Sequence, residues 1–169
     1  MVNPLGHRTT YVYDSLGNAI AAISPLGKRS TAVYDSDNRL VAEINPLGHR
    51  TTMVLNADDL VVARINSLGQ RTTMLYDANR RPLASMDPLL QRTTIGYDSA
   101  GQQVRVTNAL GKITTTIYDA ASRPVVSLDA LGNRSSVIYD VVGRIVAAIN
   151  PLGKRTTTVY DHASRVIAT

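Results

Sequence analysis

The sequence predicts an all-β protein, an antiparallel β-meander of tandem 21-residue hairpin repeats that forms a curved or spiralling sheet. The first observation is a gapless period: one 21-residue unit recurs eight times, which is typical of proteins that stack one supersecondary unit. The second is that each unit holds two short runs rich in β-branched residues, with turn-forming residues between them. The units start at residues 3, 24, 45, 66, 87, 108, 129 and 150.

The repeats account for residues 3–169, which we expect to form a single repeat domain. Repeat arrays normally carry polar capping units at their ends, and no unit here departs from the pattern in that way. We therefore expect the chain to be a fragment of a longer array. The places of the unit are counted 1 to 21 from its first Asn, Asp or Ser.

Each unit opens on a turn signal, as in Asn45-Pro46-Leu47-Gly48. Asx followed by Pro and then Gly is typical of a type I turn, because Pro sets φ and the Asx side chain caps the local backbone. The pattern predicts a two-residue Pro-Leu loop. That loop would set place 21 of one unit opposite place 5 of the next.

Two strands are predicted in every unit, for example Arg155–Tyr160 and Ile145–Ile149. Both runs are five or six residues long, rich in Val, Ile and Thr, and bounded by turn residues. A helix is excluded, because Thr-rich segments have poor helix propensity and Pro or Gly interrupts the chain about every ten residues. The whole array would then hold about sixteen strands.

The second turn signal of the unit is Asp-x-x-Gly-Arg, as in Asp140–Arg144. It predicts a three-residue hairpin loop whose last residue adopts the left-handed conformation, which Gly, Asn and Asp tolerate. The residues at this place are Gly17, Asn38, Asp59, Gly101 and Gly143, which suit it, and Arg80, Ser122 and Ser164, which suit it less well.

Cross-strand register follows from these loops. It predicts that the loop Asp pairs with the loop Arg, as Asp35 with Arg39 and Asp140 with Arg144, and that an apolar ladder joins place 10 to place 18. The ladder pairs are Val12 with Ile20, Val33 with Val41, and Ile138 with Val146. The face that carries Tyr34, Leu40, Ala42 and Ile44 is expected to be buried.

Two units depart from the pattern. The third has lost Tyr, Asp and Arg together in Leu55–Leu60. In the fifth, Leu90 replaces the turn Gly and Gly96 replaces the strand Val, which predicts a locally distorted hairpin.

Composition excludes several kinds of chemistry. The chain has no Cys, so disulfides, thiolate metal sites and cysteine nucleophiles are excluded. It has no Phe or Trp, so small aliphatic residues must form a thin buried layer. The net charge of +5 follows the repeat rather than a basic block, which favours structural ion pairs over nucleic-acid binding. No apolar run approaches the ~18 residues of a membrane-spanning helix.

No catalytic, cofactor-binding or metal-ligating group is expected. His7 and His49 share a place that Lys, Gln and Asn occupy in other units, so this place is a solvated turn flank. His162 has no second His or Cys partner for a metal. The loop Asp residues could suggest calcium, but most have one carboxylate beside an Arg, which favours capping and pairing. We therefore expect a non-enzyme without cofactors.

The unit Tyr-Asp-x-x-Gly-Arg, followed by an apolar strand and Asp/Asn-Pro-Leu-Gly, resembles the YD repeat of RHS proteins. Seven of the eight units keep Tyr-Asp, from Tyr13-Asp14 to Tyr160-Asp161. The family includes bacterial polymorphic toxins, the B and C components of insecticidal toxin complexes, and teneurins. The resemblance implies a β-strip that winds into a hollow shell around a cargo domain or forms part of an adhesion module. Nothing matches the family's terminal self-cleaving segment.

Two main hypotheses of function follow. The first is a structural module, part of the shell wall in a larger secreted or cell-surface protein, with the rest of its own chain or an encapsulated C-terminal domain as partner. The second is a carbohydrate-binding module that stacks sugars on its tyrosines and arginines. Its candidate residues are Tyr13, Tyr34, Tyr76, Tyr97, Tyr118, Tyr139 and Tyr160.

A third hypothesis is nonspecific binding to polyanions through the Arg columns. The isolated segment is also expected to self-associate or to be marginally stable, because its end strands are unpaired and one face lacks a covering layer.

Overall fold

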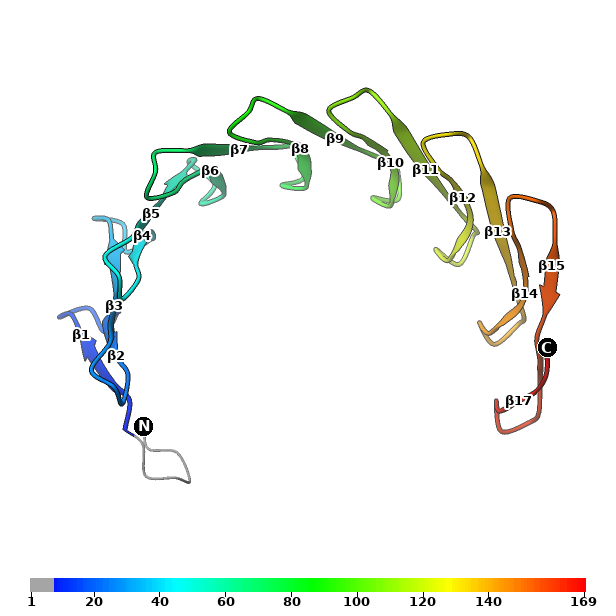
Figure 1. Ribbon diagram of the computed structural model, residues 1–169, viewed down its shortest axis with the longest axis horizontal. Helices are drawn as coiled ribbons and strands as arrows, with labels where there is room; N and C mark the ends of the chain where they lie inside the picture. The colour runs from blue at the N-terminus through cyan, green and yellow to red at the C-terminus, as the bar shows by residue number, and fades with distance from the viewer. Residues whose placement is uncertain (1–7) are drawn as a thin grey trace. The chain divides into compact units, whose positions relative to one another are not determined.

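The computed structural model describes residues 8–169, which fold into β-strands joined by tight turns without any helix (Figure 1). The predicted opening turn of the first unit, at Asn3–His7, lies outside the described residues. The described chain divides into two compact units, one ending at Leu90 and one beginning at Gln91. We call them the N-terminal and C-terminal units and describe each by itself.

The strands of both units follow the predicted runs closely. The N-terminal unit contains β1 (Thr10–Tyr13), β2 (Ala19–Ile23), β3 (Arg29–Tyr34), β4 (Leu40–Ile44), β5 (Arg50–Leu55), β6 (Val61–Ile65), β7 (Arg71–Tyr76) and β8 (Pro82–Met86). The C-terminal unit contains β9 (Arg92–Tyr97), β10 (Gln103–Thr107), β11 (Ile113–Tyr118), β12 (Pro124–Leu128), β13 (Arg134–Tyr139), β14 (Ile145–Ile149), β15 (Arg155–Thr157), β16 (Val159–Tyr160) and β17 (Val166–Ala168).

Each strand pairs with the next along the chain, always antiparallel. This holds for β1 to β8 in the N-terminal unit and for β9 to β15 in the C-terminal unit, while β16 and β17 form a separate hairpin. The predicted strand Arg155–Tyr160 is divided at Thr158, whose N–H donates to the carbonyl of Val146 at 2.9 Å. The predicted all-β meander is therefore confirmed. The curvature expected of the whole array stays a prediction.

The Asp-x-x-Gly-Arg loops adopt the predicted three-residue form. The N–H of Asp140 donates to the carbonyl of Arg144 at 2.9 Å, and Gly143 has a φ of 88°. Arg80, Ser122 and Ser164 take the same left-handed conformation with a φ of 62° each, despite their side chains. The loop geometry therefore prevails over the residue's own preference at these three places.

The Pro-Leu-Gly turns differ from the prediction. The N–H of Asn45 donates to the carbonyl of His49 at 3.0 Å, and Gly48 has a φ of 81°. The loop therefore contains three residues, Pro46 to Gly48, and Ile44 pairs with Arg50. The predicted two-residue loop was wrong. The left-handed glycine is the third residue of the loop, and the strands pair again only after it.

A β-bulge recurs beside every Asp-x-x-Gly-Arg loop of the described hairpins and overturns the predicted apolar ladder. Tyr34 pairs with Leu40 as expected, but Val33 pairs with Ala42, so Val41 is the extra residue. The other predicted ladder pairs fail in the same way: Val12 pairs with Ala21, and Ile138 pairs with Ala147. A bulge adds one residue to one strand only, and no feature of the loop residues announces it.

The bulge also changes which columns share a face. After it, Ala42 and Ile44 lie on the face of Val33, and Tyr34 lies on the other face. The predicted common face of Tyr, Ala and Ile was therefore wrong, although the alanines are indeed the buried residues. Ala21, Ala42, Ala63, Ala84 and Ala147 are at most 3% exposed.

The sheet has a single layer, and this limits its core. Apart from the alanine column, only Met53 and Val126 are buried among residues 8–169, and no large side chain is fully enclosed. Each buried alanine lies opposite a branched residue, as Ala63 opposite Val54. A small residue beside a large one fills the layer, so the limited apolar burial of the sheet comes from packing across strand pairs.

The fifth unit keeps the common hairpin, contrary to the predicted distortion. Gly96 pairs with Arg105, with the usual bulge beside it. Arg105 occupies the place of the buried alanine, and a Cβ on Gly96 would approach the Arg105 Cβ to 3.3 Å. The large Arg105 is thus accommodated because the residue opposite it, Gly96, has no side chain. Leu90 takes the glycine conformation with a φ of 62°.

The third unit keeps its loop without Asp and Arg. The Asn56 side-chain oxygen accepts hydrogen bonds from the N–H groups of Asp58 at 3.0 Å and Leu60 at 2.9 Å. The amide oxygen therefore replaces the carboxylate as a cap.

Candidate functional site

The Asp of each loop holds the turn through its carboxylate. At Asp140, one carboxylate oxygen accepts the N–H groups of Val142 at 3.0 Å and Arg144 at 2.8 Å. The other oxygen accepts the Nε–H of Arg144 at 2.7 Å. The same side chain thus caps the backbone and orients the arginine that leaves the loop.

Five loops contain this Asp–Arg ion pair, as the sequence predicted. Nitrogen to oxygen distances lie between 2.7 and 2.8 Å in all five. The pairs are Asp35–Arg39, Asp77–Arg81, Asp119–Arg123, Asp140–Arg144 and Asp161–Arg165. In the first loop, Asn18 replaces arginine and donates to Asp14 at 2.8 Å.

The arginine extends beyond its own loop to the next hairpin. The Arg123 guanidinium carbon lies 4.6 Å from the ring centroid of Tyr139, and Arg144 lies 4.7 Å from that of Tyr160. Arg144 also donates to the backbone carbonyl of Asp161 at 3.2 Å. Each arginine therefore joins its own Asp to the next repeat by a cation–π contact and a hydrogen bond.

The tyrosine hydroxyl makes a second link between the two hairpins, since it donates to a backbone carbonyl of the preceding hairpin. The Tyr139 hydroxyl donates to the carbonyl of Pro124, the residue after Arg123, at 3.0 Å. Tyr160 donates in the same way to Ile145 at 3.0 Å, and Tyr118 to Gln103 at 3.1 Å. In the N-terminal unit, Tyr76 donates to Val61 at 3.1 Å.

We call this set the inter-repeat latch: the Asp and Arg of one loop with the Tyr of the following hairpin. It is complete, with ion pair, ring contact and hydroxyl bond, for Arg123 with Tyr139 and for Arg144 with Tyr160. The sequence pattern identified all three residue types and the Asp–Arg pair. It did not indicate that the arginine reaches the tyrosine of the next unit.

Within each unit, the candidate glycan-binding tyrosines occupy the same place of different hairpins and share one face of the sheet. Tyr13 is 59% exposed and lies beside Tyr11, with ring centroids 6.5 Å apart. The other six are half-buried. Since arginine covers one ring face of Tyr139 and of Tyr160, a sugar would have to stack on the opposite face there. Glycan binding stays a prediction.

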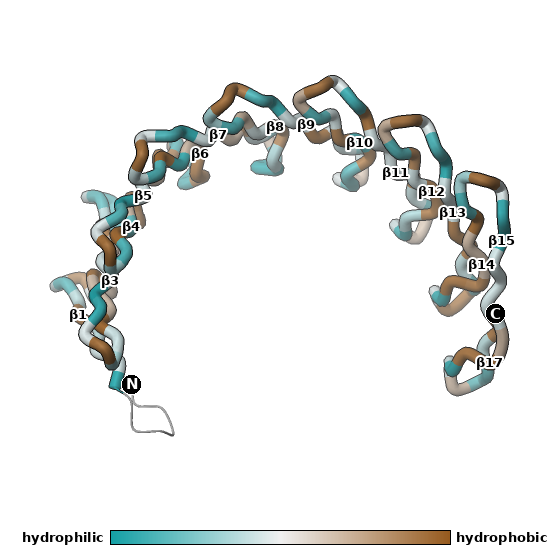
Figure 2. Tube along the Cα trace, in the orientation of Figure 1, coloured by the Kyte–Doolittle hydropathy of each residue, from teal (hydrophilic) through white to brown (hydrophobic). Residues whose placement is uncertain are grey.

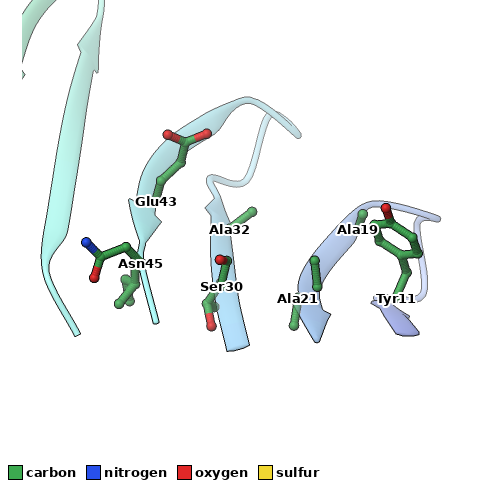
Figure 3. Close-up of a pocket in the computed structure, with 10 residues that line it drawn as sticks. Tyr11, Ala19, Ala21, Ser30, Ala32, Glu43 and Asn45 are labelled. Atoms are coloured by element: carbon green, nitrogen blue, oxygen red, sulfur yellow. The ribbon is translucent and has the colours of Figure 1, made fainter. Parts of the chain in front are cut away.

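An open hollow lies over β1 to β4 in the N-terminal unit. Figure 3 shows Tyr11 on β1 and Glu43 on β4 at its two ends, with short side chains such as Ala19, Ser30 and Ala32 between them. The hollow exists because alanine and serine replace larger residues here. One phenol and one carboxylate with no further acid or base among its lining residues do not form a catalytic group.

No group of three His, Asp or Glu residues that could hold a metal ion occurs among residues 8–169. Over the same described stretch, the structure contains no helix that is long and apolar enough to cross a membrane.

The latch makes stability depend on pH. The pKa of Asp119 is lowered first by the side-chain hydrogen bond of Arg123, and that of Asp140 first by the backbone N–H of Arg144. The pKa values of Asp14, Asp35, Asp77, Asp129 and Asp161 are lowered as well. Since the folded pKa lies below the unfolded value of 3.8, the stabilisation is present above that value and is lost as pH falls through the folded pKa values.

We therefore expect urea midpoints to be constant near neutral pH and to fall steadily below about pH 4. The D119N variant should show a shallower fall than the wild type. A urea midpoint that stays constant down to about pH 2 would contradict the role of these carboxylates.

Comparison with known proteins agrees with this architecture. The RHS Repeat family model matches residues 97–137. The crystal structure of TcdB2-TccC3 superposes with a TM-score of 0.71 at 18% identity, over 92% of this chain and 9% of that chain. TcdB2-TccC3-TEV gives a TM-score of 0.61 at 12% identity, over 95% and 11% of the two chains. A comparison with curated proteins gave no match.

The fold and the latch together define a structural repeat module, a strip of β-hairpins in which each repeat is fastened to its neighbour. The resemblance to RHS and YD-repeat proteins is confirmed, by the RHS Repeat match over residues 97–137 and by the fold of the whole described strip. At these identities the likeness to the toxin-complex structures concerns the fold. The chain spans about a tenth of the length of the solved chains it matches.

Proposed function

We propose that this chain is a non-catalytic segment of the wall of an RHS-type shell in a longer secreted or cell-surface protein. The observation that carries the proposal is the inter-repeat latch. It engages the repeated polar side chains of the unit with one another and with the backbone. The same residues that define the motif serve to fasten hairpins, which is the requirement of a wall.

A second support is the length relation. The chain covers 9% of the TcdB2-TccC3 chain that it resembles in fold. A strip of this length is a part of such a structure, and its partners are then the remaining repeats of its own protein. A C-terminal domain enclosed by those repeats is the cargo that this function would require.

Electron microscopy of the full-length protein tests the wall function. The result expected is a hollow particle in which these eight repeats are a continuous part of the wall. An extended rod, or repeats that project from a separate globular body, would contradict it. Protection of a C-terminal domain from protease in the intact protein, and its loss after cleavage within the repeats, would show enclosure.

The carbohydrate hypothesis is tested separately on a glycan array. We expect no binding that depends on the tyrosine column. Binding that disappears in the Y34A/Y76A variant but persists in the control Y11A, with the fold of both retained, would support glycan recognition instead. Tyr11 is a suitable control because it is exposed but does not belong to the column.

A further inference from the structure

The turn that opens each unit has leucine as the middle residue of its loop. Each of these leucines that the structure describes is exposed. Exposures range from 77% at Leu89 to 92% at Leu152. The N-terminal unit presents Leu26, Leu47, Leu68 and Leu89, and the C-terminal unit presents Leu110, Leu131 and Leu152. In a meander these turns share one edge of each unit, which we call the leucine edge. Figure 2 shows apolar stretches recurring in the turns of the strip.

Loop geometry does not require these leucines. The turns on the opposite edge have the same three-residue form, with the same hydrogen bonds and a left-handed third residue. Their middle residues vary widely: Leu16, Asp37, Asp58, Asn79, Ala100, Ala121, Val142 and Ala163. The leucine is therefore retained in all units for a reason outside the hairpin, and an exposed apolar row is typical of an interaction surface.

The two edges carry opposite charge, most clearly in the N-terminal unit. Its leucine edge, residues 24–29, 45–50, 66–71 and 87–90, holds four Lys or Arg residues and one Asp. The opposite edge, which we call the aspartate edge, comprises residues 14–18, 35–39, 56–60 and 77–81. It holds six Asp and three Arg residues. Asp37 and Asp59 both pair with the single Arg39, yet keep 69% and 64% of their side chains exposed.

The aspartate edge also offers apolar contacts at matching intervals. Every loop from the third unit on carries Ala or Val at one of its two tip places, and Val141 and Val142 are among the most exposed apolar residues. Both edges present one turn per hairpin, so the leucines on one edge and the loops on the other are spaced at the same interval. A hollow lined by Leu68, Arg71 and Leu89 separates two successive leucine turns and could receive a loop tip.

We propose that the leucine edge of one copy of this chain docks on the aspartate edge of a second copy. The leucines pack against the Ala and Val tips, and the lysines and arginines beside them face carboxylates. Because the two surfaces differ, the contact is head-to-tail and does not close after two copies. The association is therefore concentration-dependent and weakened by salt.

Sedimentation velocity of the purified chain tests this association. We expect oligomers that grow with protein concentration and dissociate as sodium chloride is raised. The variant L26Q/L47Q/L68Q/L89Q should raise the dissociation constant about a hundredfold or more, a change equivalent to ~2.8 kcal/mol. R29E/R50E/R71E should act in the same direction, and circular dichroism checks that both variants keep the β-fold.

The control variant L75T/I117T/V159T removes three apolar side chains from the sheet face, where they are 46% to 48% exposed. They lie opposite the alanine column, so circular dichroism must first show that this variant also keeps the β-fold. It should leave the association unchanged. Loss of association in this control, but not in the leucine variant, would overturn the proposal. A wild-type chain that remains monomeric at high concentration and low salt would also overturn it.

Mixing distinguishes head-to-tail docking from a symmetric contact between leucine edges. The leucine variant still has its aspartate edge, so it should join wild-type oligomers at one side and shorten them. A symmetric contact would exclude the variant and leave the wild-type oligomers at their original size, which would contradict the proposed geometry.

Discussion

Replacing Ala42 with arginine is expected to lower the free energy of unfolding by about 2 kcal/mol, since overpacking a filled site is unfavourable. Ala42 is fully buried and lies opposite Val33. The guanidinium of such an arginine can reach solvent, as that of the exposed Arg105 does, so the cost comes from its stem crowding Val33. Urea denaturation followed by circular dichroism measures the change.

The fifth unit provides the compensating change. There Arg105 occupies the alanine place and Gly96 lies opposite. Adding V33G to A42R should recover about 1 kcal/mol, although glycine alone weakens a strand. The control A42V should cost less than A42R, because Val126 already occupies this place opposite Ile117. An A42R variant as stable as the wild type would show that the alanine column is not the packed layer of the sheet.

Removing the tyrosine hydroxyls of Tyr76, Tyr118, Tyr139 and Tyr160, which donate to the preceding hairpin, is the second large change. The variant Y76F/Y118F/Y139F/Y160F should lose about 2 kcal/mol, at roughly 0.5 kcal/mol for each partly exposed hydrogen bond. The rings and their contacts with arginine remain, so the loss reports the hydroxyl bonds alone. Chemical denaturation monitored by circular dichroism gives the value.

Tyr34 is the matched control for this experiment. It occupies the same place of the unit, but its hydroxyl makes no hydrogen bond to any residue in the stretch 8–169. Y34F should therefore change the unfolding free energy by less than about 0.5 kcal/mol. A loss in Y34F equal to the average loss per site in the fourfold variant would show that the hydroxyl bonds to neighbouring hairpins contribute nothing.

Local signals predicted most of the fold. Pro-Leu-Gly and Asp-x-x-Gly-Arg located every described turn, and the β-branched runs between them located the strands. The Asp–Arg pair also followed from sequence, because both residues belong to one short loop. Arg80, Ser122 and Ser164 adopt the left-handed conformation because the loop hydrogen bonds impose it on a residue that does not favour it.

Register and faces were not predictable in the same way. The bulge at Val41 leaves no local mark, yet it moves Ala42 and Ile44 to the face opposite Tyr34. The connection from Arg123 to Tyr139 joins residues of different repeats, and its geometry depends on the bulged register and on a long flexible side chain. A single sequence shows which residue types can form such a contact, but not which two residues form it.

The latch gives a physical reason for the repeated motif. Asp fixes the loop and aims the arginine, the arginine covers the ring of the next tyrosine, and that tyrosine returns a hydrogen bond to the residue after the arginine. A strip with one thin layer has little buried apolar area per residue. Polar contacts that repeat at each hairpin therefore contribute an unusually large share of the cohesion between repeats.

A double-mutant cycle between Arg123 and Tyr139 tests this account most directly, because the two residues belong to neighbouring repeats. Unfolding free energies are measured for the wild type, R123Q, Y139L and the double variant. We predict a favourable coupling of about 0.5–1 kcal/mol, as for a cation–π contact at an exposed site. The control cycle of R123Q with Y118L, in the same hairpin, should show less. A coupling of zero between Arg123 and Tyr139 would contradict the inter-repeat latch.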